Sequence, residues 1–284
     1  MVVTPRFRNV SWGRRVSVKI CLGGLLGIYL IWTWFPIIWM LLTALKKEQN
    51  MFSFPPKFFF PPTLDNYKYL FSEIGINKYL WNSILVAFFS TAIALFFGSL
   101  GGFALARGRI AGKKQIAFWI IATRMVPIAA MILPLYMIFR TFHVLNTIQA
   151  LIFAHVSFNL PFVIWLMHGF FKEIPVTLEE AALVDGCNKL QSFFRVALPT
   201  VMPGLLVTAI LSIMFSWNDY AYASLFTAAE SQTLPVVVAR LITQRGILWG
   251  QVMSMGSMIF LPILAVGLMI QKYLVRGFTM GAVK

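Results

Sequence analysis

The sequence predicts an all-α fold, a polytopic transmembrane helical bundle with about six spans. Two observations support this class. Hydrophobic residues make up 59% of the 284 residues and charged residues only 12%, whereas soluble domains carry about 25% charged residues. The apolar residues also gather into blocks of about 20 or more, the length that a helix needs to cross a bilayer. Because these blocks are too long and too uniformly apolar for the strands of a membrane barrel, we expect helices.

The apolar blocks predict a cytoplasmic N-terminal segment at 1–21, a transmembrane domain at 22–273 and a cytoplasmic tail at 274–284. The first block is long enough to span and lacks a small-residue cleavage site, so we interpret it as a retained helix. The predicted spans are 22–45, 80–106, 115–139, 148–170, 204–226 and 251–273. Prolines inside these spans either kink the helices or are the prolines common in membrane helices; they are Pro36, Pro127, Pro134, Pro161 and Pro262.

Two glycine pairs at the spacing of four residues predict close approach between helix backbones. The first pair is Gly23 and Gly27 in the first span, and the second is Gly98 and Gly102 in the second span. Ordinary helix packing is the interpretation that this pattern favours.

The positions of lysine and arginine predict that both ends of the chain lie in the cytoplasm. With the N-terminus inside, most of the 24 basic residues fall in the segments on the inner side, in agreement with the positive-inside rule. The first outer segment opposes this assignment, because it holds Lys46, Lys47, Lys57, Lys68 and Lys78. The same scatter among short segments, without a groove-reading motif, argues against a nucleic-acid partner despite the net charge of +15.

The segment between the fourth and fifth spans predicts a helical hairpin on the inner side, at 171–203. Thr177 and Glu180 have the spacing of a capping box at the start of a first short helix, with Pro175 just upstream. Gly186 suits the left-handed residue that ends such a helix. A second short helix then places four apolar side chains on one face: Leu190, Phe193, Phe194 and Ala197.

Exposed apolar side chains on this hairpin predict a cytoplasmic partner that covers them. The alternative is an amphipathic helix that rests on the lipid surface. The hairpin lacks the lysine-rich flank that such interfacial helices favour, so a protein partner is the preferred interpretation.

The hairpin also resembles the EAA loop of ABC importer permeases. The similarity rests on Glu180-Ala181-Ala182, Gly186, Val196 and Leu198-Pro199 at the spacing of that family, which usually has Ile in place of Val196. Further segments resemble the carbohydrate-uptake, maltose-type branch of these permeases. They are Asp65-Asn66-Tyr67, Asn82-Ser83, Ile132-Leu133-Pro134-Leu135-Tyr136, Leu145-Asn146-Thr147, Phe215-Ser216-Trp217-Asn218-Asp219 and the tail from Gly277 to Lys284.

The resemblance implies the permease subunit of an importer that moves a carbohydrate by alternating access. Its partners would be a second homologous permease, two ATPase subunits and a soluble substrate-binding protein. ATP binding would close the ATPases, move the hairpin as a lever around Gly186 and tilt spans three to six. The tail from Phe278 to Lys284 would also reach the ATPases. The residues implied in ATPase coupling are Glu179, Glu180, Ala181, Ala182, Asp185, Gly186, Leu198 and Pro199.

Within this set, three acids are assigned different roles. Glu180 either caps its own helix or contacts the ATPase, and both readings stay open. Glu179 and Asp185 are the favoured contacts with the ATPase, because neither is needed by the predicted cap.

The chain itself is not expected to hydrolyse ATP. Its nearest match to a phosphate-binding loop, Gly108-x-x-x-Gly112-Lys113-Lys114, is one residue short and lacks the Ser or Thr that would bind Mg²⁺. The cysteines and histidines have no metal-ligand spacing. We therefore expect no cofactor in this chain, with ATP and Mg²⁺ bound by partner subunits.

Polar residues inside the spans are the candidates for the substrate path. An ionisable residue in a membrane helix is a functional hypothesis by default, and Arg124 and Asp219 lie within the third and fifth predicted spans. Direct pairing of these two is open, and so is a purely structural role as interhelical contacts. Trp217 offers a stacking face and Asn218 an amide to a sugar. The full candidate set is Arg124, Asn159, Trp217, Asn218 and Asp219.

Three other functions compete with carbohydrate import. A permease of the same family for glycerol phosphate or another small polar solute would share most of these features. An ion-coupled secondary transporter would be expected to show internal repeats and several membrane acids, and Asp219 is the only acid inside a predicted span. A structural membrane scaffold would not need the hairpin.

Overall fold

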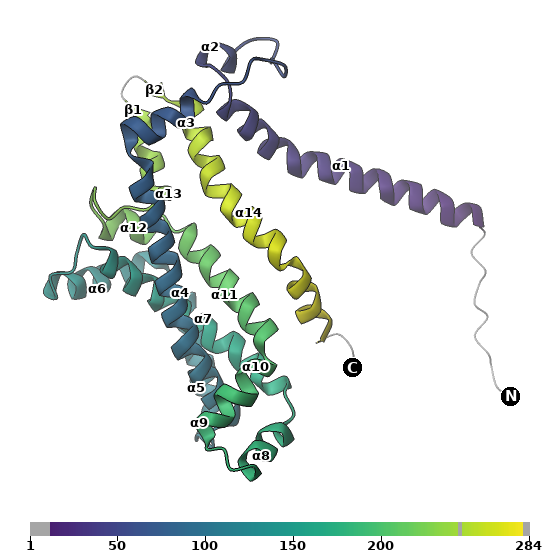
Figure 1. Ribbon diagram of the computed structural model, residues 1–284, viewed down its shortest axis with the longest axis vertical. Coiled ribbons are helices and arrows are strands. Elements are labelled where there is room, and N and C mark those ends of the chain that lie inside the picture. Colours follow the sequence, from purple (N-terminus) through teal and green to yellow (C-terminus); the bar gives the residue numbers. More distant parts are fainter. Residues whose placement is uncertain (1–11, 244–245, 281–284) are drawn as a thin grey trace. The chain divides into compact units, whose positions relative to one another are not determined.

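The computed structural model describes residues 12–243 and 246–280, which are mostly helical (Figure 1). The predicted tail residues 281–284 and the first residues of the predicted N-terminal segment lie outside the described residues. Four helices contain segments long and apolar enough to cross a membrane, and two bent helix pairs raise the number to six if each pair is one span. The four are α1 (Trp12–Ala44), α4 (Ile76–Arg107), α7 (Ile148–Glu173) and α14 (Trp249–Met280). The all-α membrane bundle is therefore confirmed.

The third predicted span is broken in the middle. α5 (Lys113–Ala122) continues into the 3-10 turn η2 (Thr123–Met125), and α6 (Ile128–Thr141) then leaves at an angle of 93°. Pro127 explains the break, because a proline disfavours helical geometry in the preceding residue. Val126 is extended, with φ −65° and ψ 127°. The other four prolines in the predicted spans lie inside continuous helices.

The fifth predicted span, 204–226, is wrong as a single helix. α11 (Met202–Trp217) ends early, and a separate short helix, α12 (Ala221–Phe226), follows after a turn. At its other end α11 is bent by 79° from the helical segment Lys189–Thr200. Asp219 therefore lies in a turn between two helices rather than inside a span.

The chain divides into two compact units. In its described part, the first contains residues 12–67 and 249–257, and the second contains 68–243, 246–248 and 258–280. The first unit includes α1, the short helix α2 (Glu48–Met51) and the start of α3 (Asp65–Tyr69).

Asn66 and Tyr67 have structural roles in the first unit. The buried Asn66 amide donates hydrogen bonds to the carbonyl oxygens of Ala44 at 2.8 Å and Lys46 at 2.9 Å. The hydroxyls of Tyr67 and Ser257 are 2.7 Å apart. Lys46 is buried with its ammonium over the ring of Trp39 at 4.6 Å, and this burial lowers the pKa of its amino group.

The second unit is built around the packing of α4, α7 and α11. A cluster that includes Val163, Met167, Phe171 and Phe193 fills the end where α4 and α7 finish, and a second cluster around Phe139, Leu151 and Phe226 fills the other end. The remaining elements of this unit are η1 (Leu70–Ile74), α13 (Leu234–Val237), η4 (Val238–Leu241) and the antiparallel pair β1 (Ile242–Thr243) and β2 (Gly246–Ile247).

The Gly98 and Gly102 pair does bring two helices together, as predicted. A Cβ atom added to Gly102 would lie 2.8 Å from the backbone nitrogen of His168, and one added to Gly98 would lie 2.5 Å from a methyl carbon of Val163. Only glycine permits this approach of α4 to α7. Around Gly23 and Gly27, by contrast, no atom of the described residues comes within 4 Å of an added Cβ.

Candidate functional site

The segment 171–203, here called the coupling hairpin, forms the predicted pair of short helices. These are α8 (Val176–Val184) and α9 (Lys189–Ser192), and α9 continues through the π-helical turn η3 (Phe193–Ala197) into α10 (Leu198–Thr200). Gly186 has φ 88°, the left-handed geometry expected of it. The hairpin lies at the end of the second unit where α4 and α7 both finish (Figure 1).

The predicted capping box at Thr177 and Glu180 is wrong. The N-cap of α8 is Pro175, two residues before Thr177, and no side-chain cap is found there among the described residues. Thr177 therefore lies inside the first turn of α8 and not at its N-cap position. A capping box does form at the second helix: the amides of Asn188 and Gln191 each donate to the other's side chain at 2.9 Å.

The single apolar face predicted for the second helix is divided in the structure. Phe193 and Ala197 are buried, whereas Leu190 is 62% exposed and Phe194 46% exposed. Phe193 and Ala197 belong to the apolar cluster with Val163, Met167 and Phe171, and Leu190 and Phe194 lie outside it. The exposed apolar side chains of the hairpin leave a surface for a partner; they are Val176, Leu178, Leu183, Val184, Leu190 and Phe194.

Glu179 is held inside the protein, which differs from its predicted role as a free contact. The Nε of Arg107 donates to its carboxylate at 2.7 Å, and the same guanidinium donates to the carbonyl oxygen of Ile174 at 2.8 Å. Glu180 and Asp185 are exposed and keep their carboxylates available. Of the other predicted coupling residues, Ala182 is buried and Leu198 partly buried, while Ala181, Gly186 and Pro199 are exposed.

The second candidate site is a cavity of about 230 Å³ beside the break in the third span, here called the polar cavity. Arg124 lies at this break, and its guanidinium lies 4.3 Å from the ring centres of both Phe162 and Phe215. It also donates to the carbonyl oxygen of Phe158 at 3.4 Å. The lining residues are Thr123, Arg124, Val126, Ile128, Met131, Ser157, Phe158, Phe215, Asp219 and Tyr222.

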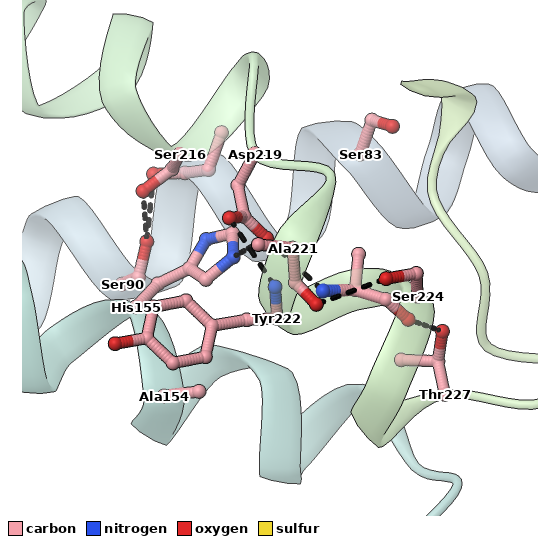
Figure 2. A network of polar contacts seen from close by, with 12 residues as sticks. Ser83, Ser90, Ala154, His155, Ser216, Asp219, Ala221, Tyr222, Ser224 and Thr227 are labelled. Atoms are coloured by element: carbon pink, nitrogen blue, oxygen red, sulfur yellow. Dashed lines mark hydrogen bonds and ion pairs between the residues drawn. The ribbon is translucent and has the colours of Figure 1, made fainter. Parts of the chain in front are cut away.

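Asp219 lines the same cavity but is bound by other groups. Its carboxylate accepts from the backbone amides of Tyr222 at 3.4 Å and Ala223 at 3.0 Å, at the start of α12. One carboxylate oxygen lies 3.2 Å from Nε2 of His155, which is fully buried (Figure 2). Among the described residues Arg124 forms no ion pair, so the pairing of Arg124 with Asp219 is not observed.

The remaining predicted path residues do not line the cavity. Trp217 is buried, and its indole N–H donates to the carbonyl oxygen of Ile259 at 3.0 Å, so the stacking role predicted for it does not fit this structure. Asn159 is buried between α7 and α11 and donates to the hydroxyl of Ser216 at 2.9 Å. Asn218 donates to Met214 within its own helix at 2.8 Å.

Sequence reasoning missed His155 and Arg107. His155 is an ionisable residue inside a predicted span, and the criterion that selected Arg124 applies to it equally. Arg107 is predicted only to be one of the basic residues on the inner side. Its partner Glu179 is 72 positions away, and the local pattern around either residue carries no sign of the pairing.

Comparison with known proteins identifies the family. Residues 94–280 match the model of the "Binding-protein-dependent transport system inner membrane component". The chain belongs to this family. The permease is 37% identical over 250 residues to the "Probable ABC transporter permease protein y4oR" of Sinorhizobium fredii, an alignment that covers 88% of this chain and 90% of that protein.

Two further relatives agree with this assignment. The permease is 34% identical to the "Diacetylchitobiose uptake system permease protein DasC" of Streptomyces coelicolor, covering 88% of this chain and 91% of that one. It also superposes with a TM-score of 0.79 and 25% identity on a chain of a bacterial ABC transporter involved in the import of the acidic polysaccharide alginate. That match covers 94% of this chain and 99% of the other. The predicted multi-pass ABC permease is confirmed.

Proposed function

We propose that this permease is the membrane-embedded subunit of an ATP-driven importer in the bacterial inner membrane. It receives a carbohydrate from a soluble binding protein outside and releases it into the cytoplasm. The observation that carries this proposal is the coupling hairpin, which presents an exposed apolar surface and two free carboxylates beyond the ends of α4 and α7. Such a surface needs a partner.

The partners are a second homologous permease and two ATPase subunits, with ATP and Mg²⁺ bound by the ATPases. Both termini of this chain, and the coupling hairpin, lie on the cytoplasmic side. Glu180 and Asp185 contact the ATPase, while Glu179 acts inside the permease. ATP binding closes the ATPases and moves the hairpin, and the helices above it reorient to open the path outward.

A carbohydrate is the cargo that the relatives favour, since diacetylchitobiose and alginate stand in the names of two of them. The polar cavity is the part of this chain that contacts the cargo. It combines the carboxylate of Asp219 and the guanidinium of Arg124 with the rings of Phe158 and Tyr222. These two rings are stacked, with their centres 5.7 Å apart and an angle of 7° between their planes. Polar groups beside aromatic faces are the usual composition of a pocket that orients a small ligand.

The test is uptake by the complex in proteoliposomes, with the permease, its second permease, the ATPase and the binding protein. Radiolabelled diacetylchitobiose, maltose, trehalose and glycerol 3-phosphate are offered in turn. We expect ATP-dependent uptake of at least one saccharide, which stops when the ATPase is replaced by a variant without its phosphate-binding lysine. Uptake driven by an ion gradient without ATPase would overturn the proposal, and uptake of glycerol 3-phosphate alone would overturn the assignment of a carbohydrate.

A further inference from the structure

Arg107 is the last residue of the long helix α4, and its side chain contacts the coupling hairpin at two points. As the C-terminal residue of α4, it donates to the carboxylate of Glu179 in α8 at 2.7 Å and to the carbonyl oxygen of Ile174 at 2.8 Å. Ile174 is the C-cap residue of α7, just before α8. One guanidinium thus joins α4 to the end of α7 and to α8.

The ion pair is shielded from water on both sides. The side chain of Arg107 is 15% exposed and that of Glu179 only 9%. Removing one partner of a buried ion pair costs more than breaking an exposed pair, because the remaining charge is left buried without compensation. By comparison, the Lys78–Glu230 pair near the other end of α4 joins side chains that are 43% and 85% exposed.

An aromatic cluster joins α4 and α7 to η3, in the second half of the hairpin. Phe103 of α4 lies 5.3 Å from Phe171 of α7 and 5.1 Å from Phe193 of η3, measured between ring centres. Phe171 and Phe193 are themselves 5.9 Å apart. Together with the close contact of α4 and α7 at Gly102, this packing makes α4, α7 and the hairpin one block.

We infer that Arg107 is a positioning residue that fixes the coupling hairpin to α4, so that movement of α8 is transmitted directly to the α4–α7 pair. This inference rests on the proposed function, in which an ATPase moves the hairpin. Without Arg107 the hairpin would be held to α4 by apolar packing, which includes the aromatic cluster. Force on α8 would then rotate the hairpin about Gly186 and the backbone connections instead of moving α4.

Lysine does not replace this arginine. A planar guanidinium donates to a carboxylate and a carbonyl oxygen at the same time and in fixed directions, whereas an ammonium is a single compact charge. We therefore expect Arg107→Lys to keep the charge interaction with Glu179 and to lose the geometry that includes Ile174.

The experiment measures the distance from α8 to α4 by electron paramagnetic resonance between two spin labels. One label is placed at Val184 in α8, which is 87% exposed, and one at Phe97 in α4, which is 57% exposed. Cys21 and Cys187, both free, are first replaced by serine. The complex with its ATPase is measured without nucleotide and after trapping with ATP and vanadate, so no transported solute is needed.

We expect one narrow distance distribution in both nucleotide states of the parent protein. Arg107→Gln and Glu179→Gln should each raise the population of a detached hairpin by about tenfold to hundredfold, which is the effect of losing a charge-assisted hydrogen bond. The charge-exchanged variant, Arg107→Glu with Glu179→Arg, should restore the narrow distribution in part. Lys78→Gln is the matched control at the other end of α4 and should change nothing.

The inference is overturned if Arg107→Gln leaves the distribution narrow, or if the parent distance already changes between nucleotide states. The ATPase activity of the complex separates this result from failure of the proposed function. If the purified complex hydrolyses ATP and traps vanadate while the distances contradict the inference, only the role of Arg107 is wrong. If no ATPase associates with the chain, the proposed function itself is wrong.

Discussion

At the scale of single residues, the buried pair of His155 and Asp219 organises the region around the polar cavity. Asp219 accepts hydrogen bonds from two backbone amides at the start of α12, where the helix dipole also favours a negative charge. The hydroxyls of Ser90 and Ser216 are 3.0 Å apart beside this pair (Figure 2). These contacts connect α4, α7, α11 and α12 through side chains rather than through apolar packing alone.

Replacement of Asp219 separates its capping role from its charge. Asp219→Ala should destabilise the permease by about 2 kcal/mol or more, because the α12 amides lose their acceptor and His155 its partner. Asp219→Asn should cost less, since an amide oxygen still accepts from the helix. Thermal unfolding of the purified protein in detergent measures both values. Equal losses from the two variants would show that the cap contributes nothing.

At the scale of elements, the coupling hairpin depends on one left-handed residue. Three backbone hydrogen bonds close the end of α8, including one from the N–H of Cys187 to the carbonyl oxygen of Ala182 at 3.0 Å. Gly186 supplies the φ of 88° that this turn requires. The space around an added Cβ is open. The constraint at this position is therefore conformational and not steric.

Substitutions at Gly186 should follow backbone preference. Gly186→Pro cannot adopt φ 88°, because its ring holds φ near −65°, and it should abolish transport while the protein stays in the membrane. Gly186→Ala should cost about 1 kcal/mol, and Gly186→Asn less than that, since asparagine tolerates the left-handed region. Uptake by proteoliposomes and membrane content on immunoblots are the measurements. Normal uptake by Gly186→Pro would contradict a stiff hairpin.

The close contact between α4 and α7 at Gly102 should contribute to the stability of the permease. Gly102→Ala should destabilise the permease by about 1–3 kcal/mol, because the added methyl group meets backbone atoms of α7 that have no room to move. Gly27→Ala is the matched control within a glycine pair of the same spacing, and it should leave thermal stability of the isolated chain unchanged. A Gly102→Ala variant as stable as the parent would mean that the helices separate without cost.

At the scale of the whole molecule, the side of the membrane on which the hairpin lies is testable with a native cysteine. Cys187 in the hairpin is partly exposed, and a Cys21→Ser background removes the other cysteine. A membrane-impermeant maleimide should label Cys187 in inside-out vesicles and leave it unlabelled in intact spheroplasts. Labelling from outside would reverse the orientation predicted from the lysine and arginine distribution.

Local patterns in the sequence were enough to predict several features. Hydrophobic block length identifies membrane helices because lipid imposes a minimum apolar length on any chain. The turn at Gly186 follows from a local backbone requirement, and the hairpin pattern with its Glu-Ala-Ala sequence carried the family resemblance. The Gly98 and Gly102 spacing also predicted a real contact. Each of these signals is contained within a few turns of helix.

Tertiary structure alone decided which polar groups meet and which surfaces stay free. Glu179 and Glu180 are adjacent in sequence, yet Glu179 is buried and paired with Arg107, whereas Glu180 is exposed. Arg124 and Asp219 line one cavity without pairing, and Trp217 is turned away from it. The partners of these side chains come from helices many tens of residues away. Which side chains meet depends on how each helix is rotated about its axis and on the breaks near Pro127 and Asn218. A hydropathy average over a window of residues detects neither.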